Sequence, residues 1–138
     1  MILVDTTPLV ALCDDRDSRH GLAEAQLRKL ASAKFCTCEP VLMESCFLLR
    51  HAYERERLKE VLDGVAISSI LGTCDRHFWS DVLDWLAKYA EHKPDWADAC
   101  IAVLCGRDTT LRVWTYDQEF RTIWRRPDGS AIPLAIRA

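Results

Sequence analysis

The sequence lacks any long hydrophobic run. None of its apolar stretches approaches the roughly 18 to 20 residues that a membrane-spanning helix needs, and the longest, residues 41–49, is interrupted by Glu44 and Ser45. The N-terminus also lacks the basic start and apolar stretch of a secretory signal, because Asp5 follows the first four residues. We therefore expect a cytoplasmic protein that has no membrane anchor.

Glycine is scarce, and its five residues are scattered. They form neither the G-x-G-x-x-G fingerprint of dinucleotide-binding proteins nor a Walker phosphate loop. The four histidines have no nucleophile motif nearby, which argues against a Ser-His-Asp or Cys-His enzyme. The seven cysteines are odd in number and include no paired C-x2-C spacing, so we expect reduced thiols and no zinc site.

Positive charge is not in excess, because 18 basic and 21 acidic residues give a formal net charge of −3. This balance argues against a protein whose whole surface grips nucleic acid. Two local basic clusters remain, one at residues 50–57 and the other at residues 121–126. Each is compatible with a patch that contacts phosphate or with an ordinary solvated helix face.

The composition, 49% hydrophobic and 28% charged, is typical of a globular domain. Short apolar runs predict strands at residues 2–4, 35–37, 65–70 and 111–115, with an edge strand at 131–136. Helical periodicity predicts helices at residues 8–13, 18–31, 41–51, 53–62, 75–90 and 96–105. This alternation predicts an α/β layer fold with a mainly parallel sheet of about four to five strands. No linker or repeat is visible, so residues 1–138 are expected to form one domain.

Two of the predicted strands end in a carboxylate, at Asp5 and at Asp117. Ligand sites in parallel α/β sheets form beyond the C-terminal ends of the strands, so both acids are expected at one edge of the sheet. Glu44 and Asp98 stand within apolar helices, where an unpaired charge costs several kcal/mol. Convergence of all four acids on hard cations such as Mg²⁺ or Mn²⁺ offsets that cost.

Neighbouring residues extend this set of acids. Asp95 lies on the same helix face as Asp98, in the first turn, where the helix dipole favours negative charge. Thr6 and Thr115 place hydroxyl groups beside the strand-end acids and are expected to orient a carboxylate or a metal-bound water. Each acid alone also has a structural alternative, such as a helix N-cap for Asp95 or the start of a turn for Asp117.

The ordered set of motifs resembles the PIN-domain family, most closely the toxins of VapBC-type toxin–antitoxin pairs. The motifs are Asp5-Thr6 after a hydrophobic strand, Glu44 on a helix, Asp95 to Ala102, and Thr115 to Phe120. The resemblance implies a three-layer α/β/α fold and a ribonuclease with Mg²⁺ or Mn²⁺ as its cofactor. It implies catalytic metal ligands at Asp5, Glu44, Asp98 and Asp117, a further metal ligand at Asp95, and supporting hydroxyls at Thr6 and Thr115.

The resemblance also implies partners: an RNA substrate, a cognate antitoxin protein and a second copy of the chain in a homodimer. The antitoxin is expected to lay an apolar helix along the groove between the second and third helices and to insert a basic residue among the acids. Trp79, Trp85 and Trp124 are candidates either for the dimer contact or for the core.

Two other classes of protein compete with this interpretation. An aspartyl-nucleophile phosphatase also begins with a strand that ends in Asp, but it needs a second Asp two residues later, where Thr7 stands. A catalytically silent PIN-like module that binds RNA or protein is the more serious alternative. The intact set of four acids favours the enzyme, which would hydrolyse phosphodiester bonds with a metal-activated water.

Overall fold

The computed structural model describes residues 1–137, and Ala138, the last residue of the predicted domain, lies outside the described residues. Four strands form a parallel sheet at its centre: β1 (Ile2–Val4), β2 (Phe35–Thr37), β3 (Ser68–Ser69) and β4 (Arg112–Trp114). Their order in the sheet is β3-β2-β1-β4.

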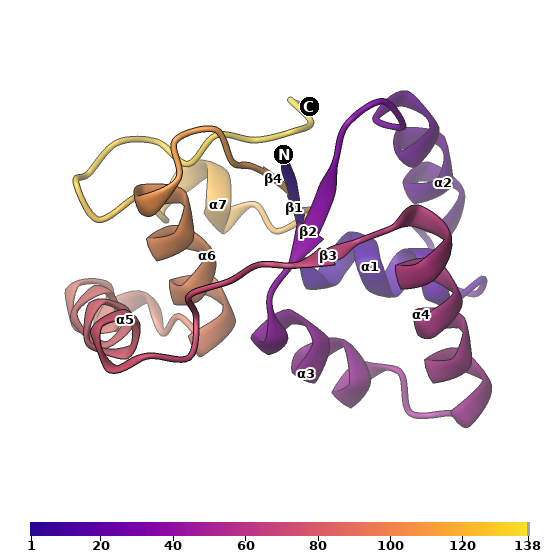
Figure 1. Ribbon diagram of the computed structural model, residues 1–138, viewed down its shortest axis with the longest axis horizontal. Coiled ribbons are helices and arrows are strands. Elements are labelled where there is room, and N and C mark those ends of the chain that lie inside the picture. The colour runs from indigo at the N-terminus through magenta and orange to yellow at the C-terminus, as the bar shows by residue number, and fades with distance from the viewer. Residues whose placement is uncertain (138) are drawn as a thin grey trace.

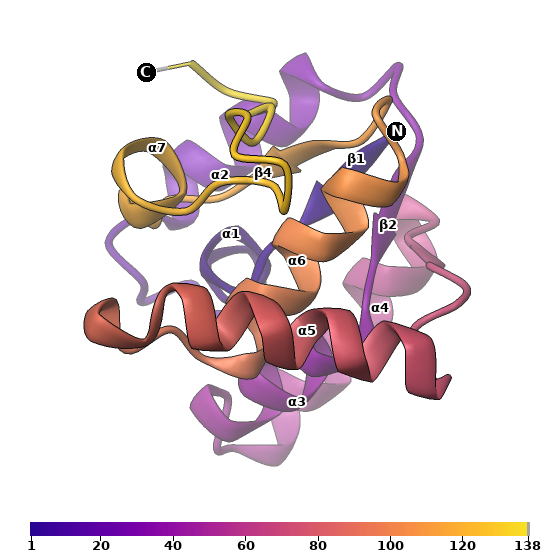
Figure 2. The ribbon, with the colours of Figure 1, turned by 90° about the vertical axis from the view of Figure 1, so that its left-hand side faces the viewer.

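Helices cover both faces of this sheet (Figure 1). On one side lie α1 (Thr6–Cys13), α2 (His20–Lys29), α3 (Glu39–Leu48) and α4 (Ala52–Val65). On the other side lie α5 (Arg76–Lys88), α6 (Trp96–Arg107) and α7 (Glu119–Thr122), with the short 3-10 helix η1 (Ala90–His92) after α5. In Figure 2, α5 crosses in front of α6. The predicted three-layer α/β/α fold with a parallel sheet is confirmed.

The central strand β1 explains why the N-terminal sequence is an unbroken apolar run. Its three residues, Ile2–Val4, are completely buried, because helices cover both faces of the sheet. Val4 pairs with Trp114 on β4, and the backbone N–H of Asp5 donates to the carbonyl of Trp114 at 3.0 Å. The C-terminal ends of β1 and β4 therefore lie side by side.

Two helices on this side begin or end at other residues than predicted. α1 begins at Thr6, two residues before the predicted start, and Asp5 is its N-cap residue. α3 begins at Glu39, because Pro40 suits the first turn of a helix, and it ends at Leu48. It stops there because Leu49 turns into the core and its carbonyl accepts a hydrogen bond from Nε of Arg55 at 2.8 Å. Leu48, the last residue of α3, is exposed.

The two predicted outer strands are shorter than expected. The strand at residues 65–70 contracts to β3, because α4 extends into this segment to Val65 and its C-cap residue, Ala66, adopts the left-handed conformation with φ of 58°. The edge strand at residues 131–136 is joined to β4 only by a bridge between Val113 and Leu134. A proline in the middle of this segment has no backbone N–H to donate to a regular ladder.

The tryptophans proposed for the dimer contact divide into two kinds. Trp85 and Trp124 are 2% and 0% exposed, and their rings meet edge to face with centroids 5.3 Å apart. Nε1 of Trp85 donates to the carbonyl of Arg125 at 2.8 Å, which fastens α5 to the C-terminal segment. These two residues are therefore core residues, and Trp79 on α5 is the one of the three that remains exposed.

The cysteines behave as apolar packing groups. All seven are free, and five of them are buried. Burial raises the pKa of the Cys13, Cys38 and Cys105 thiols to about 12, so these side chains stay protonated at neutral pH. The expectation of reduced thiols agrees with this arrangement. A separate finding is that no helix within residues 1–137 is long and apolar enough to cross a membrane.

Candidate metal centre

Asp5 lies at the middle of the candidate site, directly after β1, and is only 6% exposed. Its Oδ2 accepts a hydrogen bond from the hydroxyl of Thr115 at 2.7 Å. The same hydroxyl oxygen accepts from the backbone N–H of Asp117 at 3.0 Å. Thr115 therefore links the two strand-end acids, and the structure places them at the same edge of the sheet.

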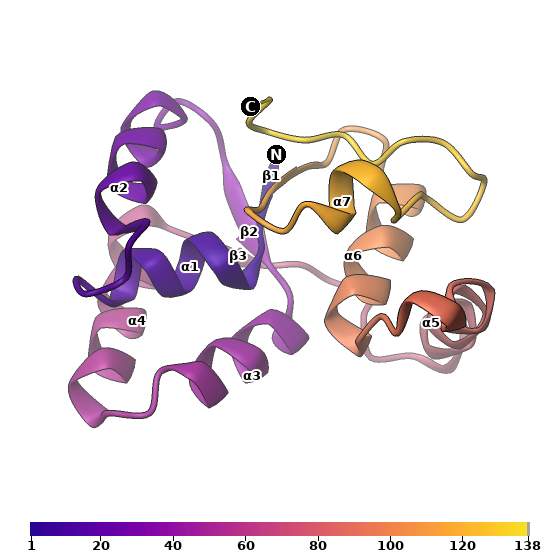
Figure 3. The same cartoon turned by 180° about the vertical axis from the view of Figure 1, so that it is seen from behind.

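The other acids come from α3 and α6, whose first turns lie together with that of α1 below the sheet in Figure 3. Glu44 is half-buried on α3, and Asp98 is half-buried in the first turn of α6. Asp95 is the N-cap of α6: its Oδ1 accepts from the N–H of Asp98 at 2.8 Å, and Oδ2 of Asp98 accepts from the N–H of Asp95 at 3.2 Å. This reciprocal capping fixes both carboxylates, so the N-cap considered for Asp95 is present.

The surroundings of Asp5 oppose its negative charge. Burial raises the pKa of Asp5 from 3.8 to about 6, against the hydrogen bond from Thr115, which lowers it. The charges of Asp117 and Asp95 raise it further. Asp5 is thus close enough to the acid that follows β4 and to the N-cap acid of α6 to be repelled by both.

Glu44 and Asp98 show the same repulsion. Burial raises the pKa of Glu44 from 4.5 to about 7. A side-chain hydrogen bond with Asp95 and the negative charge of Asp95 add to this rise. Burial, followed by the charge of Asp95, raises the pKa of Asp98 from 3.8 to about 8. The charge of Asp5 contributes to both shifts. The acids that follow β1 and β4 and those of α3 and the start of α6 therefore form one electrostatically linked group, in which Glu44 and Asp98 retain protons near neutral pH.

The donor set of this group fits a hard divalent cation. Within residues 1–137, no three His, Cys, Asp or Glu side chains stand close enough to enclose a metal as they are placed. The hydroxyl of Thr6 is buried without a hydrogen-bond partner in the same residues, although it is near enough to Glu44 to lower that pKa. Mutually repelling carboxylates and an unsatisfied hydroxyl supply the oxygen ligands and outer contacts that Mg²⁺ or Mn²⁺ prefers.

Most arginines of the two basic clusters hold the protein's own backbone. Arg55 donates to the carbonyls of Leu49 and Cys46, and Arg121 donates to the carbonyl of Ile136. Arg125 donates likewise to two nearby carbonyls, and Arg126 donates to a serine hydroxyl. These arginines therefore have structural roles, which the sequence clusters did not distinguish from phosphate contacts.

One arginine near the acids is differently placed. The guanidinium of Arg19 lies 5.3 Å from the ring centroid of Tyr116, the residue next to Asp117. Its guanidinium forms no ion pair or hydrogen bond with any other part of the described chain. The Tyr116 hydroxyl donates to Gln26 at 2.6 Å, which fixes the ring. Arg19 is thus an exposed cation against Tyr116, without an ion-pair partner in the described residues, and Tyr116 directly precedes Asp117 in the chain.

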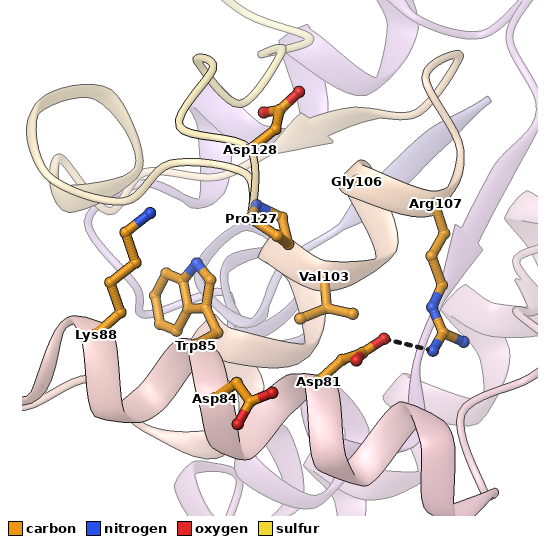
Figure 4. A pocket seen from close by; sticks show the side chains of 9 residues that line it. All are labelled: Asp81, Asp84, Trp85, Lys88, Val103, Gly106, Arg107, Pro127 and Asp128. Carbon is orange, nitrogen blue, oxygen red and sulfur yellow. Dashed lines mark hydrogen bonds and ion pairs between the residues drawn. The ribbon is translucent and has the colours of Figure 1, made fainter.

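A cavity of about 390 Å³ lies away from these acids, between α5, α6 and the C-terminal turn (Figure 4). Trp85, Val103 and Pro127 form its apolar part. Its charged groups carry both signs, and Arg107 is paired with Asp81 at 2.8 Å. None of the candidate metal ligands lines it, and its mixed charge identifies no class of ligand.

Sequence reasoning missed two residues beside the acids. The Thr7 hydroxyl accepts from the backbone N–H of Tyr116 at 2.9 Å and so joins α1 to the segment after β4. Trp96 is exposed at the first position of α6, next to Asp95. No periodic signal in the sequence marks Trp96, because Ala99, Cys100 and Val103, which share its face of α6, are buried.

The chain is thus an α/β protein with a parallel sheet and with acids gathered beyond the ends of its strands. Comparison with known proteins identifies its family. The PIN domain family matches residues 2–124, and the chain belongs to that family. Among solved structures, the Mycobacterium tuberculosis protein VapC20, described as a toxin that cleaves the sarcin-ricin loop, is similar with a TM-score of 0.68. It is 22% identical, over 88% of this chain and 93% of that chain, so the likeness shows the fold alone. No curated protein matches the chain in sequence.

Proposed function

We propose that this chain is a metal-dependent ribonuclease that hydrolyses phosphodiester bonds in RNA. The observation that carries the proposal is the convergence of acids from four separate elements around Asp5, with pKa values raised for Asp5, Glu44 and Asp98. Membership of the PIN domain family supports it, and so does the toxin activity described for a protein of the same fold. In a silent binding module, carboxylates that repel one another would lower stability without binding a cation.

The chain's residues divide into two roles in this proposal. Asp5, Glu44, Asp98 and Asp117 hold the cation, with Asp95 as a further acid beside them. When bound, Mg²⁺ or Mn²⁺ supplies a water of lowered pKa and offsets the charge that develops on the phosphate. Thr115 keeps the carboxylate of Asp5 oriented through its 2.7 Å hydrogen bond. The buried Thr6 hydroxyl lies near enough to Glu44 to lower its pKa, and so supports that carboxylate.

The proposal is tested with the purified protein and a mixture of structured and single-stranded RNAs. We expect cleavage in Mn²⁺ or Mg²⁺ and none in EDTA, with activity restored when Mn²⁺ is added back. Equal cleavage in EDTA would point to a different chemistry. Absence of cleavage with every RNA in either metal would favour the silent module.

We expect Arg19→Ala to raise KM for RNA about 5-fold to 10-fold while kcat changes little, because an exposed cation outside the acid group contributes mainly to phosphate binding. The slope of log binding constant against log salt concentration should decrease by an amount that corresponds to about one phosphate contact. Arg28→Ala is the matched control, since Arg28 is an exposed arginine in the last turn of α2. Identical KM values for the two variants would exclude a role of Arg19 in RNA binding.

We further propose that the chain is the toxin of a type II toxin–antitoxin pair, works as a homodimer, and folds as one domain over residues 1–138. Similarity to a VapC toxin in fold supports the first part. The neighbouring reading frame should encode a short protein with a DNA-binding part and a helical tail. Expression of the chain alone should arrest growth, and co-expression of that partner should relieve the arrest. Unimpaired growth during strong expression would argue against a toxin.

A further inference from the structure

A hollow of about 250 Å³ opens directly beside the candidate metal centre. It lies between the starts of α3 and α6 and is lined by Pro40, Met43, Glu44, Asp95, Trp96 and Ala97. Glu44 and Asp95 belong both to the hollow and to the group of acids. The remaining lining residues are apolar, so the hollow combines an apolar surface with two carboxylates.

Two side chains of this hollow are exposed although they are large and apolar. Met43 is 66% exposed and Trp96 is 39% exposed. Trp96 has no aromatic partner within the part of the chain that the structure describes. Its backbone is nevertheless held firmly, because the two capping hydrogen bonds between Asp95 and Asp98 fix the start of α6. The indole is therefore an exposed aromatic ring carried on a backbone that the capping bonds hold in place.

We propose that this hollow is a nucleobase subsite, in which a base next to the scissile phosphate stacks on Trp96. The inference rests on the proposed ribonuclease function and adds to it a residue that positions the substrate. A nucleotide whose phosphate lies at the acids carries its base only one sugar away, and the hollow shares Glu44 and Asp95 with those acids. Every base has a π-face that an indole can stack on, and the flexible thioether of Met43 adapts to rings of different size.

Stacking predicts a definite kinetic signature. Trp96→Ala should raise KM for a short single-stranded RNA about 10-fold, with kcat changed less than about 2-fold, whereas Trp96→Phe should retain most of the affinity. A-rich RNA should bind more tightly than U-rich RNA to the unmodified protein, and Trp96→Ala should reduce that difference. Trp79→Ala is the matched control, because Trp79 is also exposed but lies on α5 outside the hollow.

A double-variant cycle separates stacking from damage to the fold. The cleavage position is first mapped, and the bases that flank it are then replaced one at a time by an abasic nucleotide. At one flanking position the abasic RNA should raise KM for the unmodified protein as much as Trp96→Ala does, and should have no further effect on that variant. Additive effects of the variant and the abasic RNA at both positions would overturn the proposal.

Two other results have distinct meanings. If Trp96→Ala changes the mass of the protein measured by light scattering but leaves KM equal to that of Trp79→Ala, the hollow is a protein interface and the proposal is wrong. If the unmodified protein cleaves RNA and all the variants behave alike, this inference fails while the proposed function stands. If the unmodified protein neither binds nor cleaves any RNA, both fail together.

Discussion

Asp98→Asn is expected to lower kcat for RNA cleavage by about 100-fold or more, with no loss of folded protein. An amide is nearly the same size as a carboxylate, so packing at the start of α6 should be preserved, but it carries no charge and binds a hard cation weakly. The Asp98 carboxylate accepts a hydrogen bond from the N–H of Asp95 at 3.2 Å, and the oxygen of the amide can still accept it. Asp5→Asn should have an effect of similar size, because Asp5 lies at the middle of the acids.

Asp84→Asn serves as the control for these variants. Asp84 is an exposed aspartate on α5 that lies outside the acid group, so its substitution should leave kcat within about 2-fold of the unmodified protein. The measurement is steady-state cleavage of a labelled RNA at saturating Mn²⁺, with circular dichroism to verify folding. Equal rates for Asp98→Asn and Asp84→Asn would exclude Asp98 from the site.

Asp98→Asn should also stabilise the metal-free protein, and the size of this stabilisation should depend on pH. The pKa values of Asp5, Glu44 and Asp98 are raised to about 6, 7 and 8 in the folded chain, so the folded state binds more protons than the unfolded state above about pH 4. Stability must therefore fall as pH rises from about 4 to about 8. In EDTA, we expect Tm to drop by about 5 °C or more over this range.

Asp98→Asn removes the largest of these shifts, so at pH 8 in EDTA its Tm should exceed that of the unmodified protein by about 5 °C. Mn²⁺ should raise the Tm of the unmodified protein at pH 8 and have little effect on the variant, because a cation replaces the protons that the acids retain. Thermal melts at several pH values check this. A Tm that rises between pH 5 and pH 8 in EDTA, in both proteins equally, would contradict the repulsion among the acids.

The parts of this structure that local sequence determines were predictable. A buried parallel strand must be apolar throughout, so the position where Ile2–Val4 gives way to Asp5 identified both the strand and its C-terminal end. The same reasoning located Asp117 after β4. Asp95 and Asp98 were recognisable because an acid at a helix start caps the helix, and the reciprocal capping bonds are present.

Other features depend on contacts between segments far apart in the chain. Periodicity predicted a helix through residue 51, but α3 ends at Leu48, before Leu49 enters the core, and only the fold shows that Arg55 donates to the carbonyl of Leu49. The arginine clusters looked alike in sequence, although most of their members bind the protein's own backbone. The exposure of Trp96 likewise depends on which elements leave the start of α6 uncovered, which no local pattern encodes.

A Mn²⁺ titration of the metal-free protein, measured by the loss of the free-ion signal in electron paramagnetic resonance, tests the metal centre most directly. At pH 8 we expect saturable binding to the unmodified protein, weakened about 10-fold or more by Asp5→Asn and unchanged by Asp84→Asn. Binding should also weaken at pH 5.5, below the raised pKa values of the three acids. If the unmodified protein and Asp5→Asn bind Mn²⁺ equally, or neither binds it at millimolar concentration, the acids around Asp5 are not a metal centre.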